Sequence, residues 1–329
     1  MSAALLVRAL RDPASVAALD ATGWNGLIAA ARAERLIGTL AWRLDGGAVP
    51  AAAAPILDDA RRDAEREARQ ALWEADRAAQ ALRGLDVRLL LLKGTAYVAA
   101  GLRAGQGRFI GDLDILVPRA AMPQVEEALM AAGWEWVKPD PYDDAYYRQW
   151  MHELPPMIHR TRDRMIDVHH TVLPLTARQT PDAEAMIADA VAITDGLYIL
   201  STEDRIVHSV AHMLADGDLQ GGLRNLWDIY CLLPDADPRT LDARADRHGL
   251  LRHVSQARRL AAALYGDGER LTVWDRLVRA RLLARDGWGR ETRKLLVFAF
   301  YLRSHWLRMP PQMLVRHLWT KWRKGHRPQ

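Results

Sequence analysis

Apolar residues at helical spacing dominate the first part of the chain. Residues 1–84 are rich in Ala, Leu, Arg and Glu. Over residues 53–85 the apolar side chains recur on one helix face, while acids and arginines occupy the other positions. Gly84 stands where such a helix would end. The pattern predicts a helical region that caps or braces the part of the chain that follows.

The pattern changes to short, strand-like segments in the middle of the chain. Residues 89–92 form a continuous apolar run, which is too short to cross a membrane and is typical of a buried strand. Residues 112–117 alternate acids with aliphatic side chains, as a half-buried strand does. The pattern predicts strands at residues 87–92, 112–117 and 135–138, a hairpin from residues 152–161 and 164–171, and helices at residues 96–103, 121–132 and 181–192.

Helical spacing returns in the last part of the chain. Ser201 begins a capping sequence ahead of an apolar-periodic stretch. We expect an α/β (α+β) protein in which a mixed sheet is flanked by helical regions. Its expected divisions are a helical N-terminal cap at residues 1–85, a core at 86–197 and a helical C-terminal domain at 198–329. Helices are predicted at residues 206–214, 225–233, 240–248, 254–265, 273–284, 292–308 and 313–324.

The composition is that of a globular protein in a reducing compartment. The chain has 329 residues, half of them apolar, and its single cysteine, Cys231, has no partner for an internal disulfide. No apolar run approaches the roughly 20 residues of a spanning helix. Charges occur too early in the chain for a secretory signal. We therefore expect a cytoplasmic protein without a transmembrane segment.

The net charge of +4 is unevenly distributed along the chain. Residues 285–329 carry eleven Lys and Arg side chains against two acids, so the rest of the chain is net negative. That balance argues against a protein that wraps long nucleic acid. The predicted helix at 313–324 combines Trp319 and Trp322 with basic side chains, and Trp306 extends this surface. It is interpreted as a docked helix with a solvated basic end; the alternative is peripheral contact with anionic lipid, nucleic acid or an acidic partner.

Asp112 and Asp114 are the strongest chemical feature of the sequence. Residues i and i+2 of a strand project from one face, so these carboxylates lie close together and repel each other. A cation relieves the repulsion, and paired hard oxygens suit Mg²⁺ or Mn²⁺. Asp167 also lies inside an aliphatic segment, where an isolated buried carboxylate is costly. These acids predict a shared cation site; the alternative is that they form salt bridges or cap turns.

The order of these segments resembles a known group of enzymes. A strand, a turn at Gly94 and Thr95, a helix and then Asp-x-Asp on the next strand are similar to the DNA polymerase beta-like nucleotidyltransferase superfamily. More narrowly, Leu-Leu-Leu-Leu-Lys-Gly, Arg108 four residues before Asp112, and Asp-Leu-Asp-Ile-Leu-Val resemble an uncharacterised bacterial nucleotidyltransferase family. The superfamily's turn usually carries Gly-Gly or Gly-Ser, and here it is Gly-Thr. The resemblance implies a polymerase-beta-like core around a mixed sheet.

The resemblance also implies a catalytic set of acids. In the family a third carboxylate lies on a later strand in an Asp-x-His setting, which Asp167 and His169 match. Asp112, Asp114 and Asp167 are thus expected to be catalytic and to bind two Mg²⁺ or Mn²⁺ ions. Such ions neutralise a triphosphate and activate an acceptor hydroxyl for in-line attack on phosphorus.

Five residues are expected to bind the nucleotide. Gly94 allows close backbone approach, and Thr95 is expected to cap the following helix while its neighbouring N–H groups face a phosphate. Lys93 and Arg108 flank the acid pair and are candidate phosphate ligands; the alternative for Lys93 is an ion pair with an acid of the site. His169 is expected to contact the nucleotide or orient the third acid, with a purely structural role as the alternative.

His208 and His212 form a second constellation. They lie four residues apart on one predicted helix face, with Asp228 on the next predicted helix. The spacing permits a metal site, and the family shows a similar pair of helices. A convincing third ligand is missing from the sequence. We therefore interpret the pair as packing against and hydrogen bonding to the core, with a substrate contact as the second interpretation.

Together these features predict Mg²⁺-dependent transfer of a nucleotidyl group from an NTP, ATP among them, with release of pyrophosphate. Members of the resembling family are seen among genes for exopolysaccharides and modified peptides, which implies a small-molecule, sugar or peptide acceptor. One alternative is a degenerate member that binds nucleotide as a regulatory or scaffold module. A less favoured alternative is a metal-dependent phosphohydrolase built on His208, His212 and Asp216 or Asp218.

Overall fold

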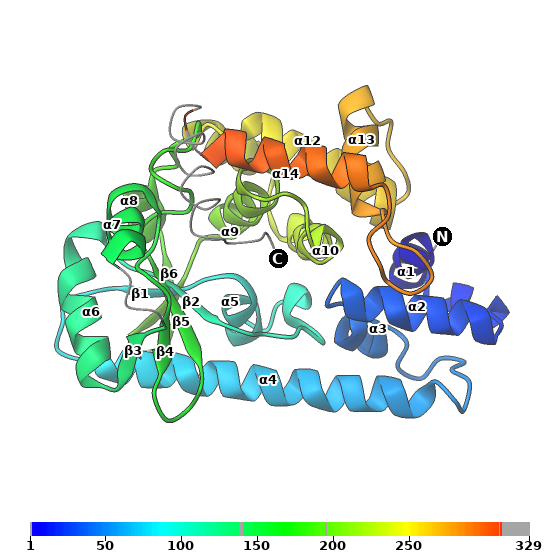
Figure 1. Cartoon of the computed structure of the whole chain (residues 1–329), viewed down its shortest axis with the longest axis horizontal. Helices are drawn as coiled ribbons and strands as arrows, with labels where there is room; N and C mark the ends of the chain where they lie inside the picture. Colours follow the sequence, from blue (N-terminus) through cyan, green and yellow to red (C-terminus); the bar gives the residue numbers. More distant parts are fainter. Residues whose placement is uncertain (1, 138–140, 195, 309, 311–329) are drawn as a thin grey trace.

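A seven-stranded mixed sheet organises the chain in the computed structural model, which describes residues 2–137, 141–194, 196–308 and 310 (Figure 1). Across the sheet the strands follow the order β3-β4-β5-β2-β1-β7-β6. Their bounds are β1 Leu89–Leu91, β2 Leu113–Leu116, β3 Trp134–Trp136, β4 Met157–His159, β5 Met165–His169, β6 Val191–Thr194 and β7 Leu197–Ile199.

The middle of the sheet joins strands that are distant in sequence. β2 pairs antiparallel with β1 and parallel with β5, and β1 pairs parallel with β7. The pairs β3–β4, β4–β5 and β6–β7 are antiparallel. Every residue of β1 and β2 is buried, as expected for strands covered on both faces. The predicted mixed sheet, its two central strands and the β4–β5 hairpin are therefore confirmed, with shorter strands than the sequence indicated.

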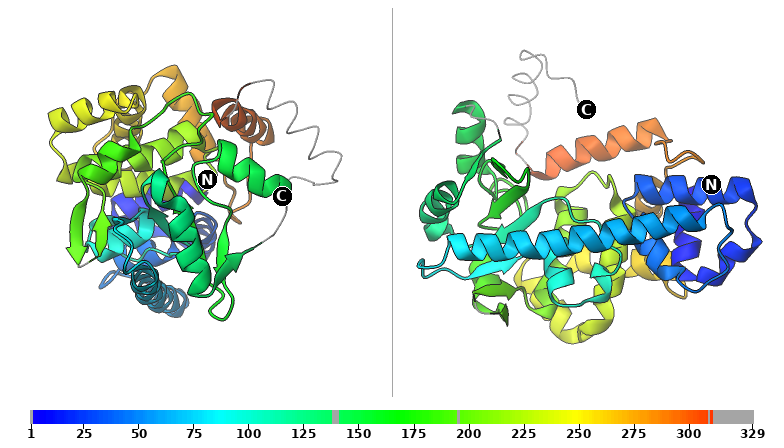
Figure 2. Two further views of the ribbon diagram at one scale, coloured as in Figure 1. Left: turned by 90° about the vertical axis from the view of Figure 1, so that its left-hand side faces the viewer. Right: turned by 90° about the horizontal axis from the view of Figure 1, so that it is seen from below.

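The N-terminal helices lead into the sheet. The long helix α4 lies against α3 at one end and against α5, α6 and β2 farther along, so it spans from the helical region to the sheet (Figures 1 and 2). This confirms the helix predicted over residues 53–85, although it ends at Ala81, three residues before Gly84, whose φ is 112°. The bounds are α1 Ser2–Arg11, η1 Pro13–Ala18, α2 Ala21–Ala33, α3 Ile37–Arg43, α4 Ala54–Ala81 and α5 Lys93–Ala99.

Helices also connect the later strands and fill the C-terminal part of the described chain. Ser201 caps α9 as predicted, because its side chain accepts a hydrogen bond from Asp204 N at 3.3 Å. Most predicted C-terminal helices are confirmed within a few residues at each end; the one predicted at residues 313–324 lies outside the described residues, as do Trp319 and Trp322. The bounds are η2 Arg103–Gly105, η3 Arg119–Ala121, α6 Met122–Ala131, α7 Pro141–Trp150, α8 Ala183–Ala188, α9 Thr202–Val210, η4 Ala211–Asp216 (a π-helix), α10 Gly222–Leu232, η5 Leu233–Asp235, α11 Pro238–Arg247, α12 Leu251–Tyr265, α13 Val273–Leu282 and α14 Lys294–Arg308.

The helix predicted over residues 181–192 is wrong in its second half. Asp182 caps α8 by accepting from Ala185 N at 2.9 Å, and this helix ends at Ala188. The chain then forms β6, which pairs with β7 at the edge of the sheet. Val191, Ile193 and Thr194 are β-branched and favour a strand. Because this edge strand is largely exposed, its side chains lack the alternating apolar pattern that identifies a half-buried strand.

One hydrophobic core runs through the sheet and both helical regions. Its buried members extend from Ala3 in α1 to Phe300 in α14, and α1 packs directly on α12. Gly38 in α3 meets Gly107 in the loop before β2 so closely that a Cβ on either residue would collide with the other's backbone. The helical regions are thus held against the loop that carries the sheet's acids. No helix among the described residues combines the length and apolarity needed to cross a membrane.

Candidate active site

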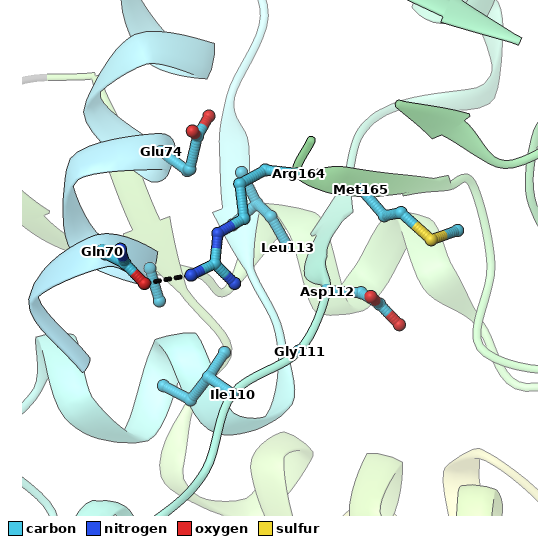
Figure 3. A pocket seen from close by; sticks show the side chains of 9 residues that line it. Gln70, Glu74, Ile110, Gly111, Asp112, Leu113, Arg164 and Met165 are labelled. Carbon is cyan, nitrogen blue, oxygen red and sulfur yellow. Dashed lines mark hydrogen bonds between the residues drawn. The ribbon is translucent and has the colours of Figure 1, made fainter. Parts of the chain in front are cut away.

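Three of the predicted acids lie on neighbouring strands. Asp114 in β2 and Asp167 in β5 are direct partners in the parallel register. Asp112 comes just before β2, is exposed, and projects to the other side of the strand from Arg164 and Gln70 (Figure 3). Alternation along β2 puts Asp112 and Asp114 toward one face. The structure therefore brings these acids to one end and one face of the central strand pair.

Asp114 is the acid with cationic partners. Its Oδ1 accepts from Lys93 Nζ at 2.6 Å and lies 3.1 Å from His169 Nε2. Burial disfavours the charged carboxylate, but Lys93 and His169 outweigh that cost and hold the pKa of Asp114 well below its usual range. Burial likewise opposes the charge on Lys93, and Asp114 nonetheless raises the pKa of Lys93 above its usual value. The ion pair expected as the alternative role of Lys93 is thus present in the structure.

Asp167 and Glu153 are two further carboxyl groups of the site. The ion pair of Lys93 with Asp114 does not stabilise their ionised forms enough to offset burial. Burial, followed by the nearby Asp114 and Asp112, raises the pKa of Asp167 to about 7. Burial, followed by Asp167, raises the pKa of Glu153 to about 8. A raised pKa means that the surroundings stabilise the ionised carboxylate poorly, as they do where nearby positive charge is insufficient. The site therefore suits an added cation, and carboxylate oxygens are the donors that Mg²⁺ and Mn²⁺ prefer.

Glu153 and His152 are site residues that the sequence did not reveal. Glu153 forms an isolated antiparallel bridge with His169. This backbone pairing places Glu153 near Asp167 and Asp114. His152, Glu153 and His169 form a group whose donor atoms all lie within 4.8 Å of one another, whereas Asp112, Asp114 and Asp167, all within the described chain, do not. Glu153 was hidden because residues 152–161 were predicted as one continuous strand, and no spacing in the sequence links it to residue 169.

The turn between β1 and α5 differs from the expected cap. α5 begins at Lys93, its N-cap is Leu92, and no side chain caps it. Thr95 is buried inside this helix, and its hydroxyl has no hydrogen-bond partner among the residues that the structure describes, so the prediction of Thr95 as the N-cap is wrong. Gly94 has the close-approach role: a Cβ there would lie 2.5 Å from Arg108 Nε. Only glycine lets the guanidinium of Arg108 lie across this turn.

Arg108 is engaged in a network of polar contacts. It forms an ion pair with Asp228 of α10, and its guanidinium lies 5.5 Å from the centre of the Tyr97 ring. Asp228 also accepts from Arg224 at 3.1 Å, and Arg224 contacts Thr39 Oγ1 in the N-terminal region. The network connects the loop before β2 to helices from both flanking regions. Asp228, left without a firm role by the sequence, is thus the partner of Arg108.

A pocket of about 650 Å³ opens beside these groups. Lys93, Asp112 and Asp114 line one side of it, and the opposite side comes from α2, η4 and the start of α10. Three of its lining residues have left-handed backbones although they are not glycines. Such strain persists where the surrounding structure enforces it and clusters at functional sites. These residues are Arg35 (φ 54°), Lys93 (φ 46°) and Leu219 (φ 65°).

Basic side chains surround the mouth of the same pocket. Arg285 pairs with Glu34 at 2.7 Å, and Arg308 pairs with Asp216 at 2.7 Å. The exposed Arg35 guanidinium also lines the pocket, and it makes no hydrogen bond or ion pair within the described ranges. The pocket thus combines acids in and just before β2 with arginines from the flanking helical regions, which suits a ligand that carries phosphates together with a metal cation.

His208 and His212 face a smaller space of about 40 Å³ that shares Lys93 and Arg108 with the main pocket. Burial lowers the pKa of His208 to about 3 and that of His212 well below its usual value, so both rings are neutral. Across the described chain, neither belongs to a cluster of three metal-donor side chains. Asp216, their proposed partner in a phosphohydrolase, pairs with Arg308 instead. The structure therefore offers no support for that alternative.

Comparison with protein families agrees with these features. A profile for a family described as uncharacterised nucleotidyltransferase matches residues 20–266, a span that runs from α2 to α12 and includes all the acids above. A search of curated proteins finds no match. The matched span is well over half of the 329 residues. The chain therefore belongs to this family of uncharacterised nucleotidyltransferases.

Proposed function

We propose that the protein transfers a nucleotidyl group from an NTP to a small acceptor and releases pyrophosphate. The observation that carries the proposal is the pairing of Asp167 with Asp114 on adjacent strands, where burial and the nearby Asp114 and Asp112 raise the pKa of Asp167 to about 7. Asp112 and Asp114 also line the 650 Å³ pocket. Membership of a nucleotidyltransferase family supports the reaction class. We further propose that residues 86–197 form a polymerase-beta-like core between a helical cap at 1–85 and a helical domain at 198–329.

Asp112, Asp114 and Asp167 would hold the divalent cations. Both polar contacts of Asp114 use Oδ1, so Oδ2 is the oxygen left for a cation. Asp112 is exposed at the pocket, and Asp167 has no cationic partner within the described chain. Mg²⁺ or Mn²⁺, bound as two ions, would offset the charge of the triphosphate and lower the pKa of an acceptor hydroxyl.

Basic residues and the β1–α5 turn would position the nucleotide. Lys93, Gly94 and Arg108 all line the pocket, and the Arg108 guanidinium packs over the backbone of Gly94. A phosphate would be held between these two cations and the backbone of the turn at Gly94 and Thr95. Arg108 donates in a planar fork that suits phosphate oxygens. The acceptor oxygen would attack the α-phosphorus as the bond to the β-phosphate oxygen breaks. His169 lies behind Asp114 and would orient that carboxylate.

The acceptor would occupy the part of the pocket that faces α10 and η4. The whole pocket has a volume of about 650 Å³, which nucleotide and acceptor would share. This volume suits a small molecule, a sugar or the end of a peptide as the acceptor, and it does not suit extended nucleic acid. The degenerate alternative, a module that binds nucleotide without turnover, is favoured by one observation. Lys93 and Arg108 already hold carboxylate partners and must exchange them for phosphate.

The proposal is tested by a screen of the four NTPs with Mg²⁺ or Mn²⁺, reading thermal stabilisation and pyrophosphate release together. We expect one NTP to raise the melting temperature only with the cation and to yield pyrophosphate when an acceptor is supplied. Asp112→Asn should abolish both responses, because Asp112 is the acid most open to the pocket. Stabilisation without product under every acceptor would favour the degenerate module. No NTP response at all would refute nucleotide binding.

A further inference from the structure

A second group of potential metal donors lies beside the acids of the proposed Mg²⁺ site. His152, Glu153 and His169 present donor atoms that all lie within 4.8 Å of one another. Glu153 Oε2 is 3.3 Å from His169 Nδ1 and 3.6 Å from His152 Nε2. In a tetrahedral site with metal–ligand bonds of roughly 2.0–2.1 Å, neighbouring donor atoms lie roughly 3.3–3.4 Å apart. The first separation already has this length, and the second is only slightly longer.

The hydrogen bonding of His169 makes the arrangement informative. Its Nε2 faces Asp114 Oδ1, an oxygen that also accepts from Lys93. A carboxylate oxygen can only accept, so the ring proton of a neutral His169 sits on Nε2 and Nδ1 carries a lone pair. That lone pair faces the carboxylate oxygen of Glu153, which is also an acceptor. Two acceptors at 3.3 Å need a cation or a proton between them.

The backbone supports the same three residues. Glu153 bridges His169 in an antiparallel pair, and Leu154 N donates to Val168 O at 2.9 Å. The imidazole rings of His152 and His169 are stacked with centres 5.2 Å apart. Three side chains from two adjacent strand-like segments are thus fixed near one point, with His152 and Glu153 partly open to solvent.

We infer that His152 Nε2, Glu153 Oε2 and His169 Nδ1 bind one transition-metal dication of the Zn²⁺ class. Two imidazoles and one carboxylate suit Zn²⁺, Co²⁺ or Fe²⁺ rather than Mg²⁺. Three protein donors leave a coordination position for water. A metal-bound histidine commonly donates its other N–H to a carboxylate, as His169 does to Asp114. The metal would therefore fix the residue that orients Asp114, and the inference does not depend on the proposed reaction.

The test is metal titration of the full-length, metal-free protein. Co²⁺ serves as an optical probe, and Zn²⁺ is used in competition. We expect one equivalent of Zn²⁺ in the wild type, and a loss of affinity of at least about a hundredfold in both His152→Ala and Glu153→Gln, which remove ligands. His305→Ala, which removes a histidine of α14, and the double variant Asp112→Asn with Asp167→Asn should keep the wild-type Zn²⁺ affinity. Circular dichroism establishes that each variant is folded.

Two results would overturn the inference. Equal Zn²⁺ affinity in the wild type, His152→Ala and Glu153→Gln would mean that the three residues form a hydrogen-bonded cluster with a shared proton. Loss of Zn²⁺ in the Asp112 and Asp167 double variant alone would place the metal among the acids of the proposed nucleotide site. Failure of NTP turnover with Zn²⁺ binding retained would refute the proposed function and leave this inference standing.

Discussion

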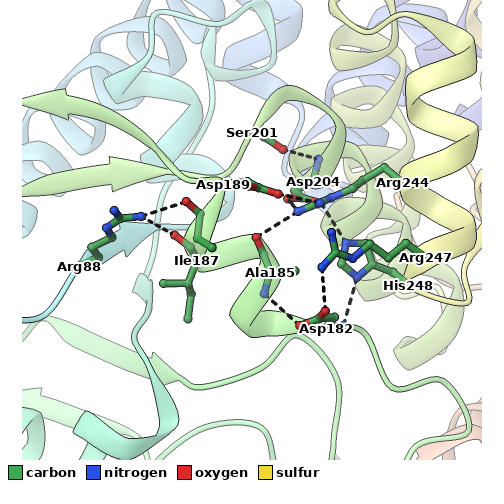
Figure 4. A network of polar contacts seen from close by, with 11 residues as sticks. Arg88, Asp182, Ala185, Ile187, Asp189, Ser201, Asp204, Arg244, Arg247 and His248 are labelled. Carbon is green, nitrogen blue, oxygen red and sulfur yellow. Dashed lines mark hydrogen bonds and ion pairs between the residues drawn. The ribbon is translucent and has the colours of Figure 1, made fainter.

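Two acids in this protein, one fully buried and one half-buried, have opposite electrostatic surroundings. Asp204 in α9 is fully buried and accepts from Arg244 Nε and Nη2, both at 2.6 Å, while His248 Nε2 lies 3.2 Å away (Figure 4). Burial opposes its ionisation, but His248 and Arg244 lower the pKa of Asp204 below its usual value. Asp167 in β5 forms no ion pair with the residues that the structure describes, and burial followed by the nearby Asp114 and Asp112 raises its pKa to about 7.

The comparison separates an acid whose charge is balanced within the chain from an acid that we propose to be functional. Around Asp204 the cations come from α11, so the charges are balanced within the chain and hold α8, α9 and α11 together (Figure 4). Around Asp167 the described residues supply no ion pair, and we propose that a bound cation balances the carboxylate. A protein keeps such an imbalance only if the surrounding structure compensates for it, and unbalanced buried acids therefore mark sites that bind cations.

The largest expected effect concerns Asp204, whose charge is balanced by Arg244. Asp204→Asn removes the charge that neutralises Arg244 and leaves that guanidinium partly buried, so it should lower the free energy of unfolding by about 3–5 kcal/mol. Denaturant titration measures this. Asp63→Asn, an exposed acid on α4, should change the same quantity by less than about 0.5 kcal/mol. A loss below about 1 kcal/mol in Asp204→Asn would show that Asp204 is not a stabilising acid.

The next effect concerns Asp167 and is measured as the pH dependence of the free energy of unfolding. The pKa of Asp167 is about 7 in the folded, metal-free protein, whereas the ordinary value for an Asp side chain, expected in the unfolded chain, is 3.8. The folded state thus binds more protons than the unfolded state between these values. Protonation of Asp167 therefore favours the folded state. This contribution to the free energy of unfolding is fully present below about pH 4 and is lost as the pH rises through 7. Asp167→Asn abolishes this dependence, so the unfolding free energies of variant and wild type should diverge by on the order of 2–4 kcal/mol between pH 4 and 8.

That divergence is measured by denaturant titration in EDTA at several pH values. Glu153 contributes in the same direction up to pH 8, so the wild type should lose stability over the whole range. Added Mn²⁺ should restore more stability at pH 8 than at pH 5, because the cation binds the ionised acids. Parallel pH curves for Asp167→Asn and the wild type would contradict the unbalanced-charge account.

Arg108 tests whether the two sides of the pocket act together. If the guanidinium leaves Asp228 to stabilise charge in the transition state, Arg108→Ala should lower kcat with little change in KM. If it binds the triphosphate uniformly, KM should rise instead. Loss of one charge-assisted contact costs about 1.5–3 kcal/mol, roughly a ten- to hundredfold effect. Arg108→Lys should recover part of it. Wild-type kinetics in Arg108→Ala, as in the exposed control Arg62→Ala, would restrict Arg108 to a structural ion pair.

The smallest expected effect concerns Arg35, whose left-handed backbone suits glycine. Arg35→Gly should raise the free energy of unfolding by about 0.5–1 kcal/mol by relieving this strain, and it should weaken NTP binding by removing a basic lining residue. Arg35→Ala keeps the strain while removing the guanidinium, so it should weaken binding without added stability. If both variants bind NTP like the wild type, Arg35 lies outside the nucleotide site.

Local patterns predicted most of the fold but only part of the site. The apolar run before Lys93 and the alternation at Asp112 and Asp114 were sufficient to locate β1 and β2. The alternation predicted a half-buried strand, whereas β2 is buried throughout, because α4 and α5 pack against it. Contacts between distant segments were not predictable in this way. Asp228 meets Arg108 from 120 residues away, and Glu153 reaches His169 through an isolated bridge. The roles assigned to the site residues stay predictions until they are measured.

The most direct test of the account is calorimetric titration of Mn²⁺ into the metal-free protein at pH 8. Asp112→Asn combined with Asp167→Asn removes two of the acids proposed to bind the cation. Asp59→Asn combined with Asp63→Asn makes the same change in charge on the exposed face of α4. The account predicts that the first pair weakens Mn²⁺ binding at least about tenfold, through lost ligands and lost local charge, while the second pair binds like the wild type. Equal Mn²⁺ affinity in all three proteins would show that the acids of β2 and β5 are not a cation site.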